Sequence, residues 1–390
     1  MTDAQTPWGI LTGIRPAKIA TKMLQSGADE QEVLRYFTQS CGTTEEKAAL
    51  ALAVAKTELP IRQAIYEDGV SIYIGIPFCP TRCLYCSFVT NGTRQAAKLI
   101  PDYLACLKRE IAYTAELVRH GQKRVETVYI GGGTPTTLDA GQLRELLDTV
   151  RASFDLTALK EFTVEAGRPD TVTREKLAVL SEAGVDRISI NPQSMHTKTL
   201  QTIGRAHTPQ QIIDAVSLAR TFNFQAINMD IIAGLPGEDF EMFCGTLDAV
   251  AALEPENITV HTMSIKRSSR LHEYLDDYTL TQGETAARMV SYARQFLADR
   301  GLQPYYLYRQ KNQLGNLENV GYAKPGLEGL YNIYIMEEIQ TILSLGCGGV
   351  TKTVDRAADR IERIFNVKEP KDYIERIDEM LARKSVLMES

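Results

Sequence analysis

The feature that most limits the possible folds is a regular alternation of strand-like and helix-like runs between residues 70 and 302. Six β-rich runs predict strands at 70–76, 125–130, 161–165, 187–190, 227–232 and 258–262. Helical patterns follow them at 101–119, 142–150, 175–183, 196–222, 243–253 and 285–300. This order predicts parallel strands that are joined by right-handed crossovers.

A closed eight-fold barrel needs eight such units and roughly 250 residues. Because the chain offers six clear units, the sequence predicts an α/β fold with an incomplete (β/α)6 TIM-like barrel. An open doubly wound sheet is the alternative. Both folds collect functional side chains at the carboxyl ends of their strands, so the expected place of a site is the same.

Two flanking segments differ in texture from this core. Residues 1–69 are typical of helices, and they include an Ala-rich helix that Pro60 is expected to end. Residues 303–390 combine a Gly-rich stretch, crowded with tyrosines, and a charged helical tail. We therefore predict three domains: an N-terminal helical segment at 1–69, the barrel at 70–302, and a C-terminal α/β extension at 303–390 that completes the substrate side.

The composition is that of a soluble globular protein, with 44% hydrophobic and 24% charged residues. No apolar run reaches the roughly 18–20 residues that cross a bilayer, and the first residues lack the pattern of a signal peptide. The net charge of −6 argues against a nucleic-acid partner, because nucleic-acid-binding domains usually carry a basic face. We expect a cytoplasmic protein without a membrane span.

Three of the seven cysteines lie close together, directly after the first predicted strand. The motif is Cys79-x3-Cys83-x2-Cys86, in a loop with two prolines. The other four cysteines are scattered and supply no matching pair for a four-ligand zinc site. Cubane iron–sulfur clusters use soft thiolates, and three thiolates leave one iron open for reaction. The alternative is three buried cysteines without chemistry.

This cysteine motif, with the aromatic Tyr85 before its last cysteine, resembles the signature of radical S-adenosylmethionine (SAM) enzymes. In that superfamily the open iron of a [4Fe–4S] cluster chelates the amino and carboxylate groups of SAM. Reduction then splits SAM into a 5′-deoxyadenosyl radical, which abstracts a hydrogen atom. The resemblance implies that Cys79, Cys83 and Cys86 hold the cluster.

Glycine-rich and polar motifs follow the later strands. Residues 131–135 read Gly-Gly-Gly-Thr-Pro, and glycines at a strand end let the backbone approach a ligand closely or form a tight turn. The segment is similar to the form found in coproporphyrinogen-oxidase-like members of the superfamily. Four polar residues at or after strand ends occur in the order that these relatives show, namely Glu165, Gln193, Arg205 and Asp230.

The resemblance covers roughly residues 70–385 and extends to the oxygen-independent coproporphyrinogen III oxidases (coproporphyrinogen dehydrogenases), in their HemZ-type branch. Motifs of that branch occur at 11–16, 308–312 and 321–326. Contacts to the cluster-bound SAM are implied for Tyr73, Gly132, Glu165 and Ile232. Contacts to a second SAM are implied for Tyr85, Gly133, Thr134, Gln193, Arg205 and Asp230. Gly75 departs from the family, which places a histidine there.

The family's substrate, coproporphyrinogen III, carries propionates on a large apolar macrocycle, so its site needs basic groups and wide apolar walls. We expect carboxylate contacts from Lys266, Arg267, Arg270, Arg309 and Lys311, with a solvated basic loop as the alternative. The implied reaction abstracts a hydrogen from the β-carbon of a propionate. Loss of carbon dioxide and one electron leaves a vinyl group, and two such events give protoporphyrinogen IX in haem synthesis. An electron donor such as flavodoxin or ferredoxin is expected.

Two other functions remain open. Some sequences of this superfamily branch are haem-binding chaperones with a His-Asn-x-x-Tyr-Trp segment. The corresponding residues 331–336 read Tyr-Asn-Ile-Tyr-Ile-Met, without the histidine or the tryptophan, although Met336 is a conceivable iron ligand. The third possibility is a radical SAM enzyme that acts on another tetrapyrrole or on RNA, and the acidic net charge disfavours RNA.

Overall fold

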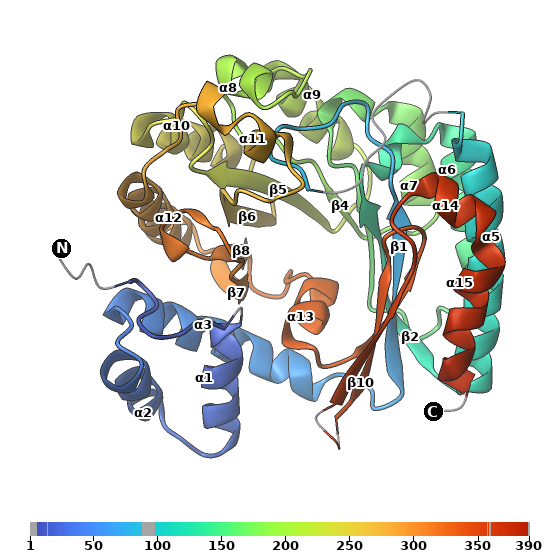
Figure 1. Cartoon of the computed structure of the whole chain (residues 1–390), viewed down its shortest axis with the longest axis horizontal. Helices are drawn as coiled ribbons and strands as arrows, with labels where there is room; N and C mark the ends of the chain where they lie inside the picture. The colour runs from blue at the N-terminus through green and yellow to red at the C-terminus, as the bar shows by residue number, and fades with distance from the viewer. Residues whose placement is uncertain (1–5, 14, 88–97, 357, 359, 389–390) are drawn as a thin grey trace.

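The computed structural model describes residues 6–13, 15–87, 98–356, 358 and 360–388. Its described strands form one curved sheet in the order β11-β10-β9-β1-β2-β3-β4-β5-β6-β8-β7, with helices around the outer side (Figure 1). The strands are β1 (Gly69–Ile76), β2 (Arg124–Gly132), β3 (Glu161–Glu165), β4 (Arg187–Ser189), β5 (Ala226–Ala233), β6 (Asn257–Thr262), β7 (Gln303–Tyr308), β8 (Asn319–Ala323), β9 (Thr341–Leu345), β10 (Val350–Asp355) and β11 (Arg360–Phe365).

Helices precede the sheet, connect its strands and close the chain. They are α1 (Pro16–Gln25), α2 (Glu30–Arg35), α3 (Glu45–Gln63), α5 (Ile100–His120), α6 (Ala140–Ser153), α7 (Arg174–Glu182), α8 (Thr197–Thr202), α9 (Pro209–Ala219), α10 (Phe240–Ala251), α11 (Arg270–Glu273), α12 (Gly283–Ala298), α13 (Leu330–Glu337), α14 (Pro370–Glu375) and α15 (Ile377–Lys384). Short turns of helix are η1 (Tyr36–Ser40), η2 (Pro135–Thr137), η3 (Pro169–Thr171), η4 (Leu275–Asp277), η5 (Leu314–Asn316) and η6 (Ser385–Met388). Within the described ranges, no helix is long and apolar enough to span a membrane.

The six predicted strands are confirmed as β1 to β6, which pair in parallel and in chain order. Their order does not reverse, as it would in a doubly wound sheet, and the described sheet stays open. The incomplete barrel is therefore confirmed. On β1, side chains alternate between the two faces, so that Ile72 and Ile74 are fully buried on one side while Tyr73 stacks with Tyr129 on the other.

The N-terminal segment is helical as predicted, but Pro60 does not end its long helix. α3 continues through Pro60 to its last residue, Gln63. A proline inside a helix removes one N–H and costs about 3 kcal/mol. Tertiary contacts hold the last turn in place: Thr57 donates to the Pro304 carbonyl on β7 at 3.1 Å, and Arg62 pairs with Glu337 at 3.2 Å.

Residues after 302 extend the same sheet. β8 pairs antiparallel with β6, β7 pairs with β8, and β9 lies parallel to β1. Helix α13 lies inside the curve of the sheet (Figure 1). The Glu161 carboxylate accepts from the N–H groups of Leu330 and Tyr331 at 2.7 and 3.1 Å, which fixes the start of α13. The C-terminal helices pack on α5, where buried Glu110 binds Lys384.

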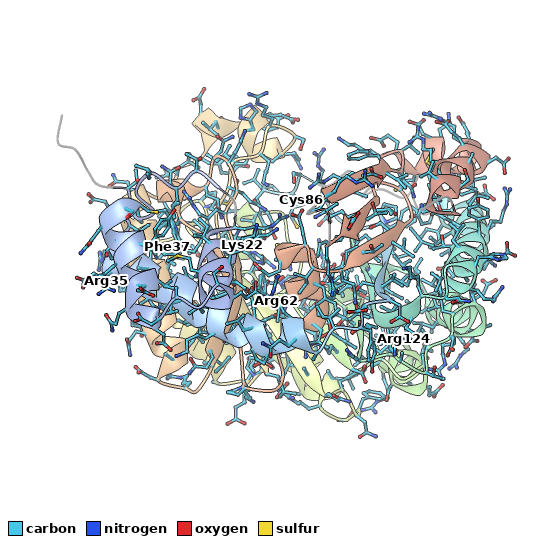
Figure 2. All side chains as sticks on the ribbon, turned by 90° about the horizontal axis from the view of Figure 1, so that it is seen from below. Lys22, Arg35, Phe37, Arg62, Cys86 and Arg124 are labelled. Atoms are coloured by element: carbon cyan, nitrogen blue, oxygen red, sulfur yellow. The ribbon has the colours of Figure 1, made fainter. Side chains whose placement is uncertain are left out.

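The parallel part of the sheet has an amino edge, where its strands begin, and a carboxyl edge, where they end. Arg124 begins β2 at the amino edge, and Cys86 follows β1 beyond the carboxyl edge. Figure 2 shows the two side chains far apart in the molecule. Most residues of the expected site lie at or beyond the carboxyl edge, where parallel α/β folds carry their functional groups, whereas Tyr73 and Asp230 stand within β1 and β5.

Candidate functional site

The three clustered cysteines lie on one loop, residues 77–87, which we call the cysteine loop. Backbone hydrogen bonds hold its start against the end of β2: the Gly133 N–H donates to the Ile76 carbonyl and the Thr134 N–H donates to the Phe78 carbonyl, both at 2.8 Å. Its tip is tied to two later segments, because the Leu84 N–H donates to the carbonyl of Ile203 and the Leu271 N–H donates to the carbonyl of Leu84, both at 2.9 Å. The loop is therefore held by the end of β2 and by the segments around Ile203 and Leu271.

The pKa of Cys79 depends on burial and on the charges of the two neighbouring cysteines. Burial raises the pKa of Cys79 to about 11, the charges of Cys83 and Cys86 raise it as well, and a hydrogen bond with Thr134 opposes them. The Cys79 Sγ lies 3.3 Å from the Thr134 hydroxyl. No disulfide joins the cysteines of the described residues.

Three thiols on one loop are the ligand type of an iron–sulfur cluster. In the part of the chain that the structure describes, no group of three His, Cys, Asp or Glu side chains converges on one point that would hold an ion. A cubane cluster takes each thiolate on a different iron, so its ligands need to share a loop and not a point. Thiolates are also the ligand type that such clusters prefer.

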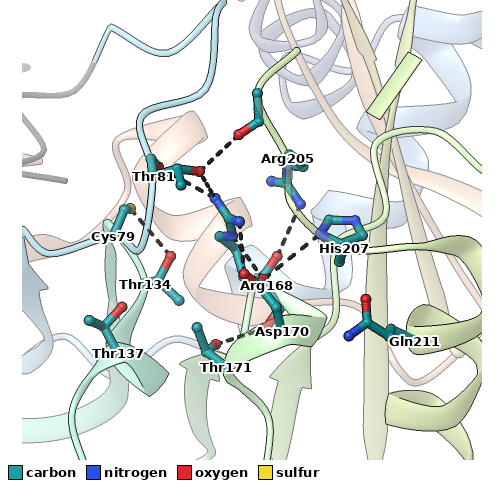
Figure 3. Close-up of polar contacts among 12 residues, drawn as sticks. Cys79, Thr81, Thr134, Thr137, Arg168, Asp170, Thr171, Arg205, His207 and Gln211 are labelled. Atoms are coloured by element: carbon teal, nitrogen blue, oxygen red, sulfur yellow. Dashed lines mark hydrogen bonds and ion pairs between the residues drawn. The ribbon is translucent and has the colours of Figure 1, made fainter. Parts of the chain in front are cut away.

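A buried cation supports the cysteine loop from the segment after β3, as Figure 3 shows. The Arg168 guanidinium donates to the Thr81 hydroxyl at 2.7 Å and to both oxygens of Asp170 at 3.0 and 2.9 Å. His207 lies 3.8 Å from the same carboxylate, and burial lowers the pKa of this imidazole to about 4. Our sequence analysis missed this group. The Arg-Pro-Asp run just after Glu165 was the signal that could have found it.

Arg205 is the second buried guanidinium at this loop. It donates to the carbonyls of Asn191 at 2.5 Å and Gly167 at 3.4 Å. Burial alone would lower its pKa, but the neighbouring Tyr85 and Cys83 outweigh this and raise it. The structure therefore brings Arg205 and Tyr85 together with the cysteines, as expected of a shared site.

The glycines after β2 are required by close packing. A Cβ on Gly133 would lie 2.7 Å from the carbonyl oxygens of both Ile76 and Phe78, which is too close for any side chain. Gly132 has a φ of +103°, in the region that favours glycine, and a Cβ there would lie 3.0 Å from the Tyr73 hydroxyl. The glycines thus let the cysteine loop approach the concave face of the curved sheet, which we call the inner face.

Glu165 ends β3 beside these glycines. Its carboxylate accepts from the Tyr129 hydroxyl at 2.6 Å and from the Gly132 N–H at 3.1 Å. Burial raises the pKa of Glu165 to about 7; the charge of Asp230 also raises it, and the hydrogen bonds from Tyr129 and Gly132 oppose the rise. The structure therefore joins three of the expected SAM contacts, because Tyr73, Gly132 and Glu165 adjoin one another.

Tyrosines cover the inner face of the curved sheet. Tyr129 and Tyr331 stack with centroids 4.4 Å apart, and Tyr73 stacks on both at 6.1 Å. Their hydrophobic cluster extends to β7, so the group that we call the inner tyrosines comprises Tyr73, Tyr129, Tyr305, Tyr306, Tyr308 and Tyr331. Sequence reasoning noted the crowding after residue 303 but missed Tyr129, because its neighbours come from distant parts of the chain.

Asp230 lies on the inner face of β5. It accepts from the Asn228 amide at 2.7 Å, and its other oxygen lies 3.6 Å from the His261 Nε2. Gln193 has a φ of +66°, and its backbone pairs with that of β5 through Asp230 and Ile232. Ile232 is buried. His261 was not expected from the sequence, where a lone histidine in a strand carries no distinctive signal.

The five expected substrate contacts are not alike. Arg267, Arg270 and Lys311 are exposed, whereas Lys266 is partly buried and burial lowers its pKa. The described residues give the Lys266 ammonium no hydrogen bond or ion pair. Arg309 donates to the carbonyls of Leu11 at 2.5 Å and Asn316 at 3.3 Å, so its guanidinium anchors the N-terminal segment.

Comparisons with known proteins show the family to which this chain belongs. The profile of the radical SAM superfamily matches residues 73–250. The oxygen-independent coproporphyrinogen-III oxidase-like protein HemZ of Bacillus subtilis is 43% identical over 391 residues, which cover 100% of this chain and 78% of HemZ. The heme chaperone HemW of the same organism is 30% identical over 293 residues, which cover 73% of each protein.

The fold is similar to that of a solved oxidase. Coproporphyrinogen III oxidase (HemN) of Escherichia coli, a radical SAM enzyme, matches with a TM-score of 0.64 and 24% identity, over 84% of this chain and 73% of that one. The superfamily implies a [4Fe–4S] cluster and SAM as cofactors. The similarity over the whole chain and the matched profile together mean that this protein belongs to the radical SAM superfamily, among the oxygen-independent coproporphyrinogen III oxidase-like proteins.

Proposed function

We propose that the protein is a radical SAM oxidoreductase that converts propionates of coproporphyrinogen III to vinyl groups and so forms protoporphyrinogen IX. One observation carries this proposal. The cysteine loop and the inner tyrosines adjoin at the end of β2, where Gly133 contacts the loop and Gly132 contacts Glu165 and Tyr73. A radical source would therefore lie next to an aromatic surface that suits a macrocycle.

When bound, the reduced cluster and SAM supply a 5′-deoxyadenosyl radical that takes a hydrogen atom from a propionate β-carbon, after which loss of carbon dioxide and transfer of one electron to an acceptor leave a vinyl group. For their part, Cys79, Cys83 and Cys86 would each hold one iron. The Thr134 hydroxyl, 3.3 Å from the Cys79 sulfur, would orient that ligand. Arg168 would hold the loop in shape at Thr81, and Arg205 would do so at Cys83 and Tyr85.

Glu165 is suited to bind the ammonium group of SAM. Its carboxylate is oriented by Tyr129 and by the Gly132 N–H. Tyr73 and Ile232 would complete the walls around the same SAM. Tyr85, Gly133, Thr134, Gln193, Arg205 and Asp230 stay predictions for a second SAM. A flavodoxin or ferredoxin would supply the electron, in the cytoplasm.

Lys266 is the strongest of the expected propionate contacts. It follows β6 at the carboxyl edge, and its loop contacts the cysteine loop, because Arg82 donates to the Ser268 carbonyl at 2.5 Å. A partly buried ammonium gains more from a carboxylate ligand than an exposed one does. The exposed Arg267, Arg270 and Lys311 would contact propionates from the solvent side. Arg309 would hold the N-terminal segment through its hydrogen bond to the Leu11 carbonyl.

The deciding experiment incubates the anaerobically reconstituted, reduced protein with SAM and coproporphyrinogen III, and follows the tetrapyrrole by mass. We expect protoporphyrinogen IX and one 5′-deoxyadenosine for each vinyl group formed. Release of 5′-deoxyadenosine with another tetrapyrrole, but not with this one, would keep the radical chemistry and change the substrate. No 5′-deoxyadenosine with any tetrapyrrole would overturn the enzyme assignment.

Haem delivery is the second candidate function, since HemW is a related chaperone. The packing of α13 opposes it. Tyr331 is buried in the tyrosine stack, and the Tyr334 hydroxyl donates to Glu126 at 3.3 Å, so these tyrosines of α13 pack into the protein interior. Stoichiometric haem binding by the anaerobic protein, together with unchanged coproporphyrinogen III, would favour the chaperone.

A further inference from the structure

A pocket lies where the N-terminal helices meet the end of α13 and the hairpin of β10 and β11. Its volume is about 280 Å³, close to the lower end of the roughly 300–1,000 Å³ that small-molecule sites occupy. The described residues that line it include none of the cysteine loop and none of the inner tyrosines. The pocket is therefore separate from the candidate site and independent of the proposed function.

Cationic side chains dominate the wall of this pocket. Among the described residues that line it, five are cationic and three are acidic. The cations stand on α1, on α3 and in the β10–β11 hairpin, and they are Lys18, Lys22, Arg62, Arg356 and Arg360. Figure 2 shows Lys22 and Arg62 near each other on the N-terminal helices. The pocket thus carries a net positive charge that it gathers from segments far apart in the sequence.

The two carboxylates at the end of α13 are already bound by cations. Glu337 accepts from Arg62 at 3.2 Å. Within the described residues, Glu338 is shared by four cations, namely Arg15, Lys18, Lys352 and Arg363. Burial is the main reason why the pKa of Lys352 is lowered, and the charge of Arg15 lowers it further. Like charges are therefore crowded here, and a further anion would relieve their repulsion.

Two guanidiniums of the wall keep donors for such an anion. The Arg356 Nε donates to the Ile339 carbonyl at 2.8 Å, and both residues line the pocket, so this side chain is held at the wall. Arg62 binds Glu337 through Nη1, and its buried Nε has no hydrogen-bond partner among the described residues. Because a guanidinium has five N–H donors, both can bind a ligand and keep these contacts. Donors that are held in advance lose less entropy on binding.

The wall also defines the class of ligand. Ile339, Val354 and Ile361 form its apolar part, which suits a short carbon skeleton. Guanidinium groups bind the oxygens of phosphates and of carboxylates in the same forked geometry. We propose that this pocket binds a compact organic polyanion, which is a small phosphate ester or a polycarboxylate. The bound anion would tie α1 and α3 to the β10–β11 hairpin.

The test titrates the cluster-loaded protein under anoxia with 3-phosphoglycerate, with citrate and with uncharged glycerol. Calorimetry measures the affinity of each, and sodium chloride keeps the ionic strength equal in all titrations. The variant is Arg356→Gln/Arg360→Gln, which removes two exposed charges of the hairpin. The control is Arg119→Gln/Lys123→Gln, which removes two exposed charges at and just after the end of α5.

We expect the wild type to bind one equivalent of 3-phosphoglycerate or of citrate with a Kd below about 1 mM, and not to bind glycerol. Tighter binding of 3-phosphoglycerate would identify a phosphate ligand, and tighter binding of citrate a polycarboxylate ligand. The hairpin variant should weaken this binding about tenfold or more, and the control should change it less than twofold. If the wild type binds neither anion, the inference is overturned while the proposed function stands.

A second variant tests the opposite wall of the pocket. Lys22→Gln removes a charge of α1 and should weaken binding of the same anion about fivefold. Circular dichroism and iron content check that each variant folds, and Lys22→Gln decides the matter if the hairpin variant does not. Anion binding that neither variant weakens would lie elsewhere on the protein and would overturn the inference.

Discussion

The cysteine loop and the inner face adjoin at one edge of the sheet but differ in charge. Two buried guanidiniums, Arg168 and Arg205, border the loop. Two carboxylates, Glu165 and Asp230, stand among tyrosines on the inner face. Cations stabilise thiolates, and carboxylates accept from ammonium and N–H groups. The difference teaches that one edge of the sheet can hold an electron-rich cluster beside a ligand that is rich in hydrogen-bond donors. Cations stabilise the cluster's thiolates, and carboxylates bind the ligand's donors.

The largest effect is expected when one cysteine of the cysteine loop is removed, because the iron–sulfur cluster should then be lost. Cys83→Ala should reduce the iron of the reconstituted protein from about four per chain to near zero and abolish the visible absorption. Cys244→Ala, which alters a cysteine on α10, should keep both. Iron analysis and absorption spectra decide this, and a full cluster signal in Cys83→Ala would refute the ligand assignment.

The second largest effect is expected from changing Arg168, the buried cation that supports the cysteine loop. Arg168→Gln leaves the Asp170 carboxylate without its bidentate partner and frees Thr81, so we expect about 3 kcal/mol of lost stability and faster loss of iron. The double variant Arg168→Gln/Asp170→Asn removes both charges and should regain part of the loss. Thermal unfolding and iron release would measure this, and equal losses in the single and double variants would show that the unpaired Asp170 charge is not what destabilises the Arg168→Gln protein.

The contact between the two regions can be broken at one glycine. Gly133→Ala places a methyl group 2.7 Å from two carbonyl oxygens, so the loop must move. We expect a destabilisation of about 1–3 kcal/mol together with weaker SAM binding. Gly141→Ala, inside α6, should be neutral or stabilising. Denaturant unfolding and SAM titration test this, and a Gly133→Ala protein with wild-type values in both would contradict the close packing.

On the inner face, pH should act through Glu165. Its carboxylate must be ionised to accept an ammonium group, so SAM binding should be full at high pH and be lost as the pH falls through about 7. Tyr129→Phe removes a hydrogen bond that lowers this pKa, so the loss should begin about one pH unit higher. SAM affinity is measured against pH for the wild type, Tyr129→Phe and Glu165→Gln. A profile in Glu165→Gln with the wild-type midpoint would assign the titration elsewhere.

The smallest effect separates the basic residues from one another. Lys266→Gln should weaken coproporphyrinogen III binding about fivefold, because a partly buried ammonium is lost. Arg267→Gln should change it less than twofold, because exposed charges are screened by water and salt. Binding titrations at two salt concentrations compare them. Equal effects would mean that these cations act only through their general field.

Local sequence was sufficient for the parallel strands and for the cysteine loop, whereas the helix predicted over 196–222 is the two helices α8 and α9. The strand and helix periods are local, so β1 to β6 appeared with nearly the right bounds. The spacing of the cysteines and the place of Glu165 at a strand end are local as well. The end of α3 was wrong, because the contacts that carry it past Pro60 come from Pro304 and Glu337, far along the chain.

The amino-acid sequence by itself thus determined the parallel α/β order, the trio of thiols after β1 and the glycines that follow β2. Only the tertiary structure decided that Arg168 supports Thr81, that Tyr331 stacks on Tyr129, and that Arg309 binds the Leu11 carbonyl of the N-terminal segment. The physical reason is range. Periodicity and spacing act over a few residues, whereas these contacts join side chains that only the curvature of the sheet and the placement of α13 bring together.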